Sequence, residues 1–121
     1  ADELGSGELG TTFGGGPLAC AAIEAVIATI RETHLLENVR RLSARLREEC
    51  VTGPVTSVQG GGFLLGLRTS RPAAGIRDAL LERDILTGTS ADPCVLRLLP
   101  PLVLEDSHVD QLVDALTEIQ P

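Results

Sequence analysis

Apolar residues recur every three or four positions along two stretches in the first half of the chain, which predicts two amphipathic helices. The first helix begins at Pro17, and its many small side chains permit close packing, so we expect it to be largely buried. Its apolar positions are Leu18, Ala22, Ala25, Val26 and Ile30. The polar residues 31–34 mark a break before the second helix, which runs to about Cys50. Its inward positions are Leu35, Val39, Leu42 and Leu46.

Short apolar segments separated by glycine and proline follow, and they predict strands at residues 55–59, 63–68, 85–87 and 94–99. Gly66, inside the second of these strands, implies a close neighbour. Residues 70–72 open a helix that ends near Arg83, and Glu105 or Asp106 begins a final helix. The expected fold is therefore α+β (an α/β small domain). It has a small three- to four-stranded, largely antiparallel sheet covered by helices on one face, preceded by an extended arm and a long helix or helical hairpin.

Residues 1–16 are acidic and rich in glycine and have no apolar periodicity, so we expect an extended arm there and one domain at residues 17–121. Thr11 and Thr12 lie just before the helix that Pro17 opens. Flexible glycine backbone, hydroxyl donors and the positive end of a helix together suit an oxyanion, most simply a phosphate. A tight connection without a ligand is the alternative, because the glycine spacing fits neither the dinucleotide-binding turn nor the lysine-containing Walker loop.

Composition narrows the function further. A net charge of −7 argues against nucleic acid or an anionic membrane as the main partner, and the longest apolar run is too short to cross a bilayer. No signal peptide is expected either. Three cysteines and two histidines fit neither a disulfide framework nor a metal site, which favours a reducing cytoplasm. The chain has no methionine, so we expect a processed, trimmed or fragmentary polypeptide. It also has no lysine, so it cannot form a Schiff base by itself.

One charged residue is unusual, because Arg97 lies in an apolar strand that ends at two prolines. Burying an unpaired guanidinium is costly, so Arg97 needs an anionic partner or solvent. The alternatives are a structural ion pair or solvent-facing edge position, and a carboxylate bound in a cleft. His34 and His108 have the settings of surface or capping residues, and Cys20 that of a small core residue. We therefore expect no catalytic residue in the chain itself.

Three motifs resemble one known family. Residues 10–22 (G-T-T-F-G-G-G-P-L-A-C-A-A) resemble the H-G-[ST]-T-[FY]-G-G-N-P-L-A-C-A-A segment of class III, fold-type I, pyridoxal-phosphate-dependent aminotransferases. Residues 58–67 resemble the hairpin V-R-G-x-G-L-M-L-G-[IV] of that family, and residues 95–102 its strand [IL]-R-[FL]-[LA]-P-P-L. The acetylornithine and succinylornithine aminotransferase branch is the most similar. Leu9 and Gly16 depart from the histidine and asparagine that the family often has.

The resemblance implies a complete enzyme that uses pyridoxal 5′-phosphate to move an amino group from an N-acylornithine-like ω-amino donor to 2-oxoglutarate, in arginine or related amino-acid biosynthesis. It implies that Thr12 donates to the cofactor phosphate of the neighbouring subunit of a homodimer, that Thr11 lies at the substrate, and that Arg97 looks toward an active-site carboxylate. The Schiff-base lysine belongs to a large domain outside this chain, so the chain alone is expected to be inactive. The alternatives are a free-standing docking or dimerisation module with a vestigial phosphate site, and a generic phosphate-binding domain.

Overall fold

The computed structural model describes residues 10–120. The chain divides into two compact units, Ala1–His34 and Leu35–Pro121, and each is described by itself. In the first unit, a loop leads into helix α1 (Pro17–Glu32), with proline in the first turn, where its missing N–H costs no hydrogen bond. Thr33 caps the helix and His34 follows with a φ of 54°, so the predicted break at residues 31–34 is confirmed. Most of the predicted arm lies outside the described residues, and the division into arm and domain stays a prediction.

Helix α1 has no buried residue, so the expectation that it is largely buried is wrong for this chain. Ile23, Val26 and Ile27 are 53%, 58% and 44% exposed. Apolar spacing shows which side of a helix suits packing, but burial also needs a covering surface, which the described residues do not supply. Within residues 10–120, no helix is both long enough and apolar enough to cross a bilayer.

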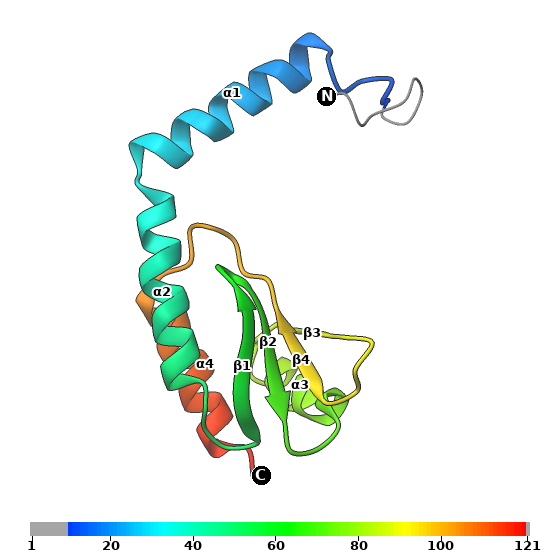
Figure 1. Cartoon of the computed structure of the whole chain (residues 1–121), viewed down its shortest axis with the longest axis vertical. Coiled ribbons are helices and arrows are strands. Elements are labelled where there is room, and N and C mark those ends of the chain that lie inside the picture. The colour runs from blue at the N-terminus through cyan, green and yellow to red at the C-terminus, as the bar shows by residue number, and fades with distance from the viewer. Residues whose placement is uncertain (1–9, 121) are drawn as a thin grey trace. The chain divides into compact units, whose positions relative to one another are not determined.

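The second unit is a four-stranded antiparallel sheet with three helices, as the α+β prediction requires (Figure 1). Its elements are α2 (Leu35–Glu49), β1 (Val55–Gly61), β2 (Leu64–Thr69), α3 (Ala73–Leu81), β3 (Gly88–Thr89), β4 (Val95–Leu98) and α4 (Asp106–Glu118). The strand order is β1-β2-β4-β3, so β2 and β4 form the centre of the sheet. Their register sets Leu65 opposite Leu98 and Leu67 opposite Leu96.

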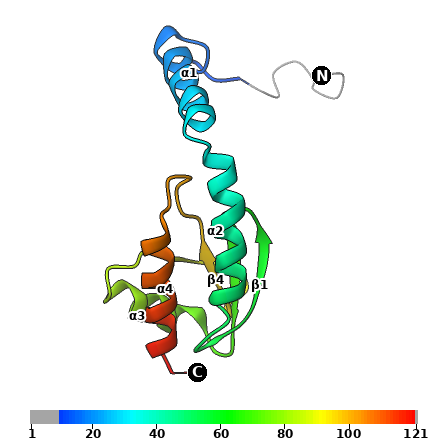
Figure 2. The ribbon, with the colours of Figure 1, turned by 90° about the vertical axis from the view of Figure 1, so that its left-hand side faces the viewer.

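One hydrophobic core holds this unit together, and all three helices contribute to it from the same face of the sheet (Figure 2). The central residues of the core are Leu42 and Leu46 of α2, Leu65 and Leu67 of β2, Ile76 and Leu80 of α3, Leu96 and Leu98 of β4, and Val109, Leu112 and Leu116 of α4. Because side chains alternate along a strand, the intervening residues of β2 and β4 lie on the opposite, uncovered face. Gly66 is one of them, and the predicted close neighbour is Val95, whose Cγ1 would lie 2.9 Å from a Cβ at this glycine.

The strand expected at residues 85–87 is wrong, because the third strand is β3, which begins at Gly88. The reason lies in how α3 ends. Asp84 has a φ of 60°, and the N–H of Ile85 donates to the carbonyl of Leu80 at 3.0 Å. This is the hydrogen bond of a Schellman helix ending, which places an apolar residue against the last turn of the helix. Ile85 therefore packs on the core as part of the helix end, and pairing with β4 starts three residues later.

Ion pairs join α2 to α4, which run in parallel. Arg41 and Arg45 both donate to Oδ1 of Asp106, at 2.6 and 2.7 Å, and Arg45 also reaches Asp110 at 2.7 Å. These hydrogen bonds, first from Arg41 and then from Arg45, hold the pKa of Asp106 well below its ordinary value. The start of α4 is thus tied electrostatically to the middle of α2.

Gly53→Ala should destabilise this unit strongly. Gly53 has a φ of 52°, and a Cβ there would lie 2.0 Å from the carbonyl oxygen of Leu116 and 2.9 Å from that of Ile119. The left-handed conformation alone costs a non-glycine residue about 1–2 kcal/mol, and the backbone of α4 would also have to move. Denaturant unfolding should show a loss of at least that size. The control is Gly61→Ala, where no atom lies within 4 Å and stability should be unchanged or slightly higher. Equal stability of the two variants would contradict this account.

Asp106→Asn should lower the melting temperature at neutral pH, because two arginines lose their carboxylate. The folded-state pKa of Asp106 is depressed, so its stabilisation is complete above about pH 4 and fades as the pH falls further. The difference in melting temperature between wild type and variant should therefore shrink below about pH 4. Asp114→Asn is the control, since Asp114 is an exposed residue of α4 that forms no ion pair within residues 10–120. A difference that is independent of pH would argue against the ion pairs.

Candidate functional site

The loop before α1 presents the two threonines singled out from the sequence. Thr11 and Thr12 are both exposed. The methyl group of Thr11 lies over Gly14, where an added Cβ would lie 2.0 Å from it, so any larger residue at position 14 would require the Thr11 side chain to turn away. No described side chain caps the N-terminus of α1, and its first turn contains no acidic residue. The positive end of the helix is therefore left without a negative partner from this part of the chain.

These groups suit one portion of a cofactor. Two hydroxyl donors and an uncapped helix N-terminus fit a phosphate group well. The rest of pyridoxal phosphate needs an amine for its aldehyde and a surface for its ring, and the chain has no lysine and only two aromatic residues. The loop therefore fits the phosphate end of the cofactor and offers no amine for its aldehyde.

The guanidinium of Arg97 lies on the uncovered face of the sheet. Its neighbours along β4, Leu96 and Leu98, point into the core, so Arg97 points the other way and is exposed. Arg68 on the same face is paired with Asp92 at 3.2 Å, whereas no acidic group of the described residues lies within ion-pair distance of Arg97. The structural ion pair considered from the sequence is thus not found within residues 10–120, and the guanidinium is free to meet solvent or a ligand.

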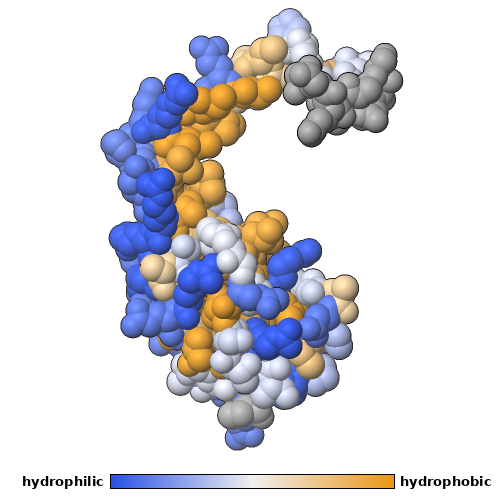
Figure 3. Space-filling view, in the orientation of Figure 1, coloured by the Kyte–Doolittle hydropathy of each residue, from blue (hydrophilic) through white to orange (hydrophobic). Residues whose placement is uncertain are grey.

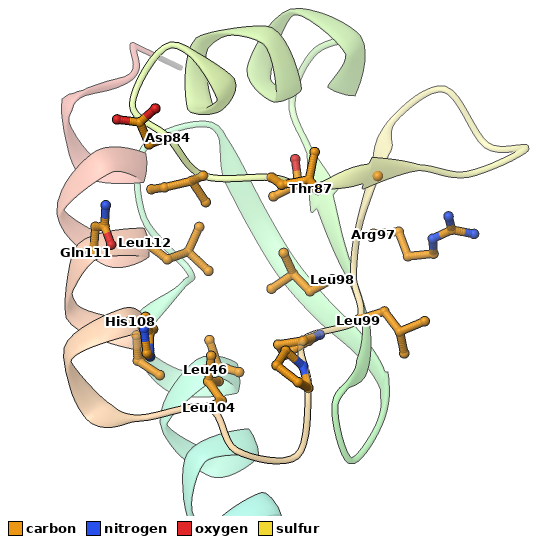
Figure 4. Close-up of a pocket in the computed structure, with 16 residues that line it drawn as sticks. Leu46, Asp84, Thr87, Arg97, Leu98, Leu99, Leu104, His108, Gln111 and Leu112 are labelled. Carbon is orange, nitrogen blue, oxygen red and sulfur yellow. The ribbon is translucent and has the colours of Figure 1, made fainter. Parts of the chain in front are cut away.

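A groove of about 600 Å³ opens beside this arginine, between α4, the segment before β3 and the loop that joins β4 to α4 (Figure 4). Its walls are mainly apolar and include Leu98, Leu104 and Leu112. Figure 4 shows Leu98 pointing into the groove and the guanidinium of Arg97 directed away from its middle. Thr87 Oγ1 is buried at the groove without a hydrogen-bond partner among the described residues. The lining contains one hydroxyl group, that of Thr87, and one imidazole, that of His108, and no hydrogen bond joins the two.

His108 and Cys50 take structural positions, whereas Cys20 does not. Nδ1 of His108 accepts a hydrogen bond from the N–H of Glu105 at 3.1 Å, which confirms its predicted capping role. Cys50 is buried, and burial raises the pKa of its thiol to about 12, so it stays protonated and unreactive. Cys20 is exposed, so the prediction that it is a core residue is wrong. Its helix lacks a covering surface among the described residues, and Figure 3 shows apolar side chains gathered along one side of α1.

The candidate residues fall in both units. Thr11 and Thr12 belong to the first, and Arg97 belongs to the second. Sequence reasoning did not single out Gly88, which lies opposite Arg97 in the sheet, nor the buried hydroxyl of Thr87. The only signal for Gly88 was a glycine between two threonines, and it gained meaning only once the strand register was known.

Comparison with known proteins identifies the family. The class-III aminotransferase family model matches residues 1–119. The acetylornithine aminotransferase of Streptomyces coelicolor is 45% identical over 98% of this chain and 30% of its own length. The structure of acetylornithine aminotransferase from Elizabethkingia anophelis superposes with a TM-score of 0.80 at 28% identity, over 97% of this chain and 33% of that one. An ornithine aminotransferase from Toxoplasma gondii, whose active site has partial occupancy of pyridoxal phosphate, gives 0.75 at 26% identity, over 98% and 31%.

This chain therefore spans about a third of the length of the relatives it matches. The match extends over almost all of its own residues, including the glycine-rich loop, the β1–β2 hairpin and the strand that carries Arg97. The resemblance seen in those three motifs is thus confirmed, and the chain belongs to the class III aminotransferases.

Proposed function

We propose that this chain is the C-terminal part of a pyridoxal-phosphate-dependent aminotransferase whose complete form transfers an amino group from an N-acylornithine-like ω-amino donor to 2-oxoglutarate. The family match over residues 1–119, with 45% identity to an acetylornithine aminotransferase, carries the proposal. Since the chain spans 30% of that relative, the lysine-bearing large domain is expected from residues outside it. The three free cysteines suit a reducing compartment, in keeping with a cytoplasmic enzyme.

In this proposal the loop before α1 binds the phosphate of the cofactor. The hydroxyl of Thr12 donates to a phosphate oxygen of the site in the neighbouring subunit of a homodimer, and the positive end of α1 adds electrostatic attraction. Thr11, the adjacent hydroxyl, contacts the substrate. The support is the exposed position of both side chains and the absence of an acidic residue from the first turn of α1.

Arg97 binds a carboxylate of the amino acid or of the 2-oxo acid. A guanidinium offers two parallel donors that match the two oxygens of a carboxylate. The support is its exposure on the uncovered face of the sheet, without an acidic partner among the described residues. The chain carries a net charge of −7, so a free cation on this face gives a dianionic 2-oxo acid a local point of attraction.

The cofactor, when bound, supplies the electron sink for moving the amino group. Residues of this chain bind and orient: Thr12 holds the phosphate, while Thr11 and Arg97 position the substrate. No side chain of this chain can hold the cofactor aldehyde, because the chain has no lysine. The chain by itself is therefore expected to be inactive.

Glutamate formation separates the complete enzyme from the chain alone. With N-acetylornithine, 2-oxoglutarate and pyridoxal phosphate, the purified 121-residue chain should form no glutamate, whereas the complete enzyme should.

In the complete enzyme, Thr12→Val should weaken retention of pyridoxal phosphate about 10-fold or more, because a hydrogen bond to a charged group contributes about 1.5–3 kcal/mol. Equilibrium dialysis followed by absorbance measures the retained cofactor.

Thr12→Ser is the matched variant, since it keeps the hydroxyl and should bind the cofactor nearly as well as the wild type. Glutamate formation by the chain alone would refute the proposed inactivity. Tight binding of pyridoxal phosphate by the chain alone would favour a free-standing phosphate-binding module. Unchanged retention in Thr12→Val would remove the role assigned to Thr12.

Arg97→Ala should raise the KM for 2-oxoglutarate in the complete enzyme by roughly 10- to 100-fold, because the carboxylate loses a charge-assisted pair of hydrogen bonds. Arg97→Lys should recover part of this loss, since it restores the charge without the planar pair of donors. Steady-state kinetics with 2-oxoglutarate as the varied substrate measures the effect.

The control for that experiment is Arg68→Ala, which removes another arginine from the same face of the sheet. Arg68 is already paired with Asp92, so its loss should leave the KM for 2-oxoglutarate unchanged. Equal effects of the two substitutions would show a general influence of positive charge and would contradict a specific role for Arg97.

A further inference from the structure

The strand pairing places a glycine on each side of Arg97. Gly66 of β2 and Gly88 of β3 are its two cross-strand partners. All three residues lie on the uncovered face, because the neighbours of Arg97 along β4 point into the core. The long side chain of Arg97 therefore stands between two positions that have no side chain.

The two glycines differ in what fills the space above them. A Cβ on Gly88 would lie 3.2 Å from both Nε and Nη2 of Arg97 and 3.5 Å from Cζ. A Cβ on Gly66 would meet Val95 at 2.9 Å and Gln59 at 3.2 Å instead. The guanidinium thus lies across β3, whereas other side chains occupy the space over β2.

This asymmetry restricts where the guanidinium can go. An exposed arginine has many rotamers, and the described residues supply no acidic partner to select one. Val95 and Gln59 close the β2 side, and the bare backbone at Gly88 provides a flat surface on the β3 side. Because a Cβ at Gly88 would crowd Nε and Nη2, these atoms lie close to the β3 backbone, and the side of the guanidinium that faces away from the sheet is left for a ligand.

We propose that Gly88 is a positioning residue for carboxylate binding: its lack of a side chain lets the Arg97 guanidinium lie against β3 and so sets the direction in which Arg97 meets the substrate. The inference rests on the proposed function of Arg97. Placement within a fraction of an ångström matters here, because an error of about 1 Å in a binding group can cost about 100-fold in rate.

The test uses Gly88→Ala and Gly88→Val in the complete enzyme. A methyl group at residue 88 would press on the end of a flexible, exposed side chain, so the fold should persist while the guanidinium shifts. We expect the KM for 2-oxoglutarate to rise about 3-fold for alanine and about 10-fold for valine, with kcat changed less than about 2-fold. This result is expected when a substitution weakens the binding of the substrate and of the transition state equally.

Two controls separate positioning from a general effect on the sheet. Gly61→Ala adds a methyl group to β1 where no atom lies within 4 Å, and it should leave KM unchanged. In an Arg97→Ala background, Gly88→Val should have no further effect on KM, since residues that act through one another are not additive. An equal effect of Gly88→Val with and without Arg97 would overturn the inference and leave a structural role only.

The experiment also distinguishes this inference from the function it rests on. If Arg97→Ala leaves KM unchanged, the proposed role of Arg97 is wrong and the role of Gly88 falls with it. If Arg97→Ala raises KM and neither substitution of Gly88 does, only the inference about Gly88 is overturned. A readout independent of activity is the NMR cross-relaxation between Hε of Arg97 and the α-protons of Gly88 in the 121-residue chain. It should be observed in the wild type, and its absence would also overturn the inference.

Discussion

The alternation of side chains along the two central strands is the constraint on which the rest of the second unit depends. The leucines of β2 and β4 that face the helices complete the core, and the residues between them form the uncovered face. A slip of one residue in the pairing would carry Arg97 into the core and a leucine out of it, so the core strongly specifies the register. The packing of the helices on one face thereby determines what the opposite face presents.

Much of the fold could be predicted from the sequence, because its helices and strands have clear periodicity and distinct ends. The break between α1 and α2, the β1–β2 hairpin and the apolar stripe of α4 all follow from local pattern. The prediction of a strand at residues 85–87 was wrong, because α3 ends with a left-handed residue at Asp84 and the N–H of Ile85 bonds to the last turn of that helix. The prediction that α1 is buried was wrong for another reason. Apolar periodicity shows which side of a helix can pack against a surface, but it does not show whether the same chain supplies that surface.

The candidate site was less accessible to sequence reasoning. Pattern alone made Thr11, Thr12 and Arg97 unusual, but it left each with two interpretations, and their proposed roles come from resemblance to a family. For Arg97, the structure argues against the structural ion pair, because no acidic partner lies near it among the described residues. Gly88 had no distinguishing local signal at all, since its significance depends on the residue that pairs with it across the strands.

The apolar residues of this chain are not all constrained by its own folding, because the apolar side of α1 is uncovered. Residues of the core in α2, β2 and α4 are constrained by the folding of this chain itself. Ile23 and Val26 in α1 have no such constraint from the described residues, because both side chains are more than half exposed. Substitutions of these two residues should therefore leave the folding stability of the second unit unchanged, so an unfolding experiment on that unit would not detect them.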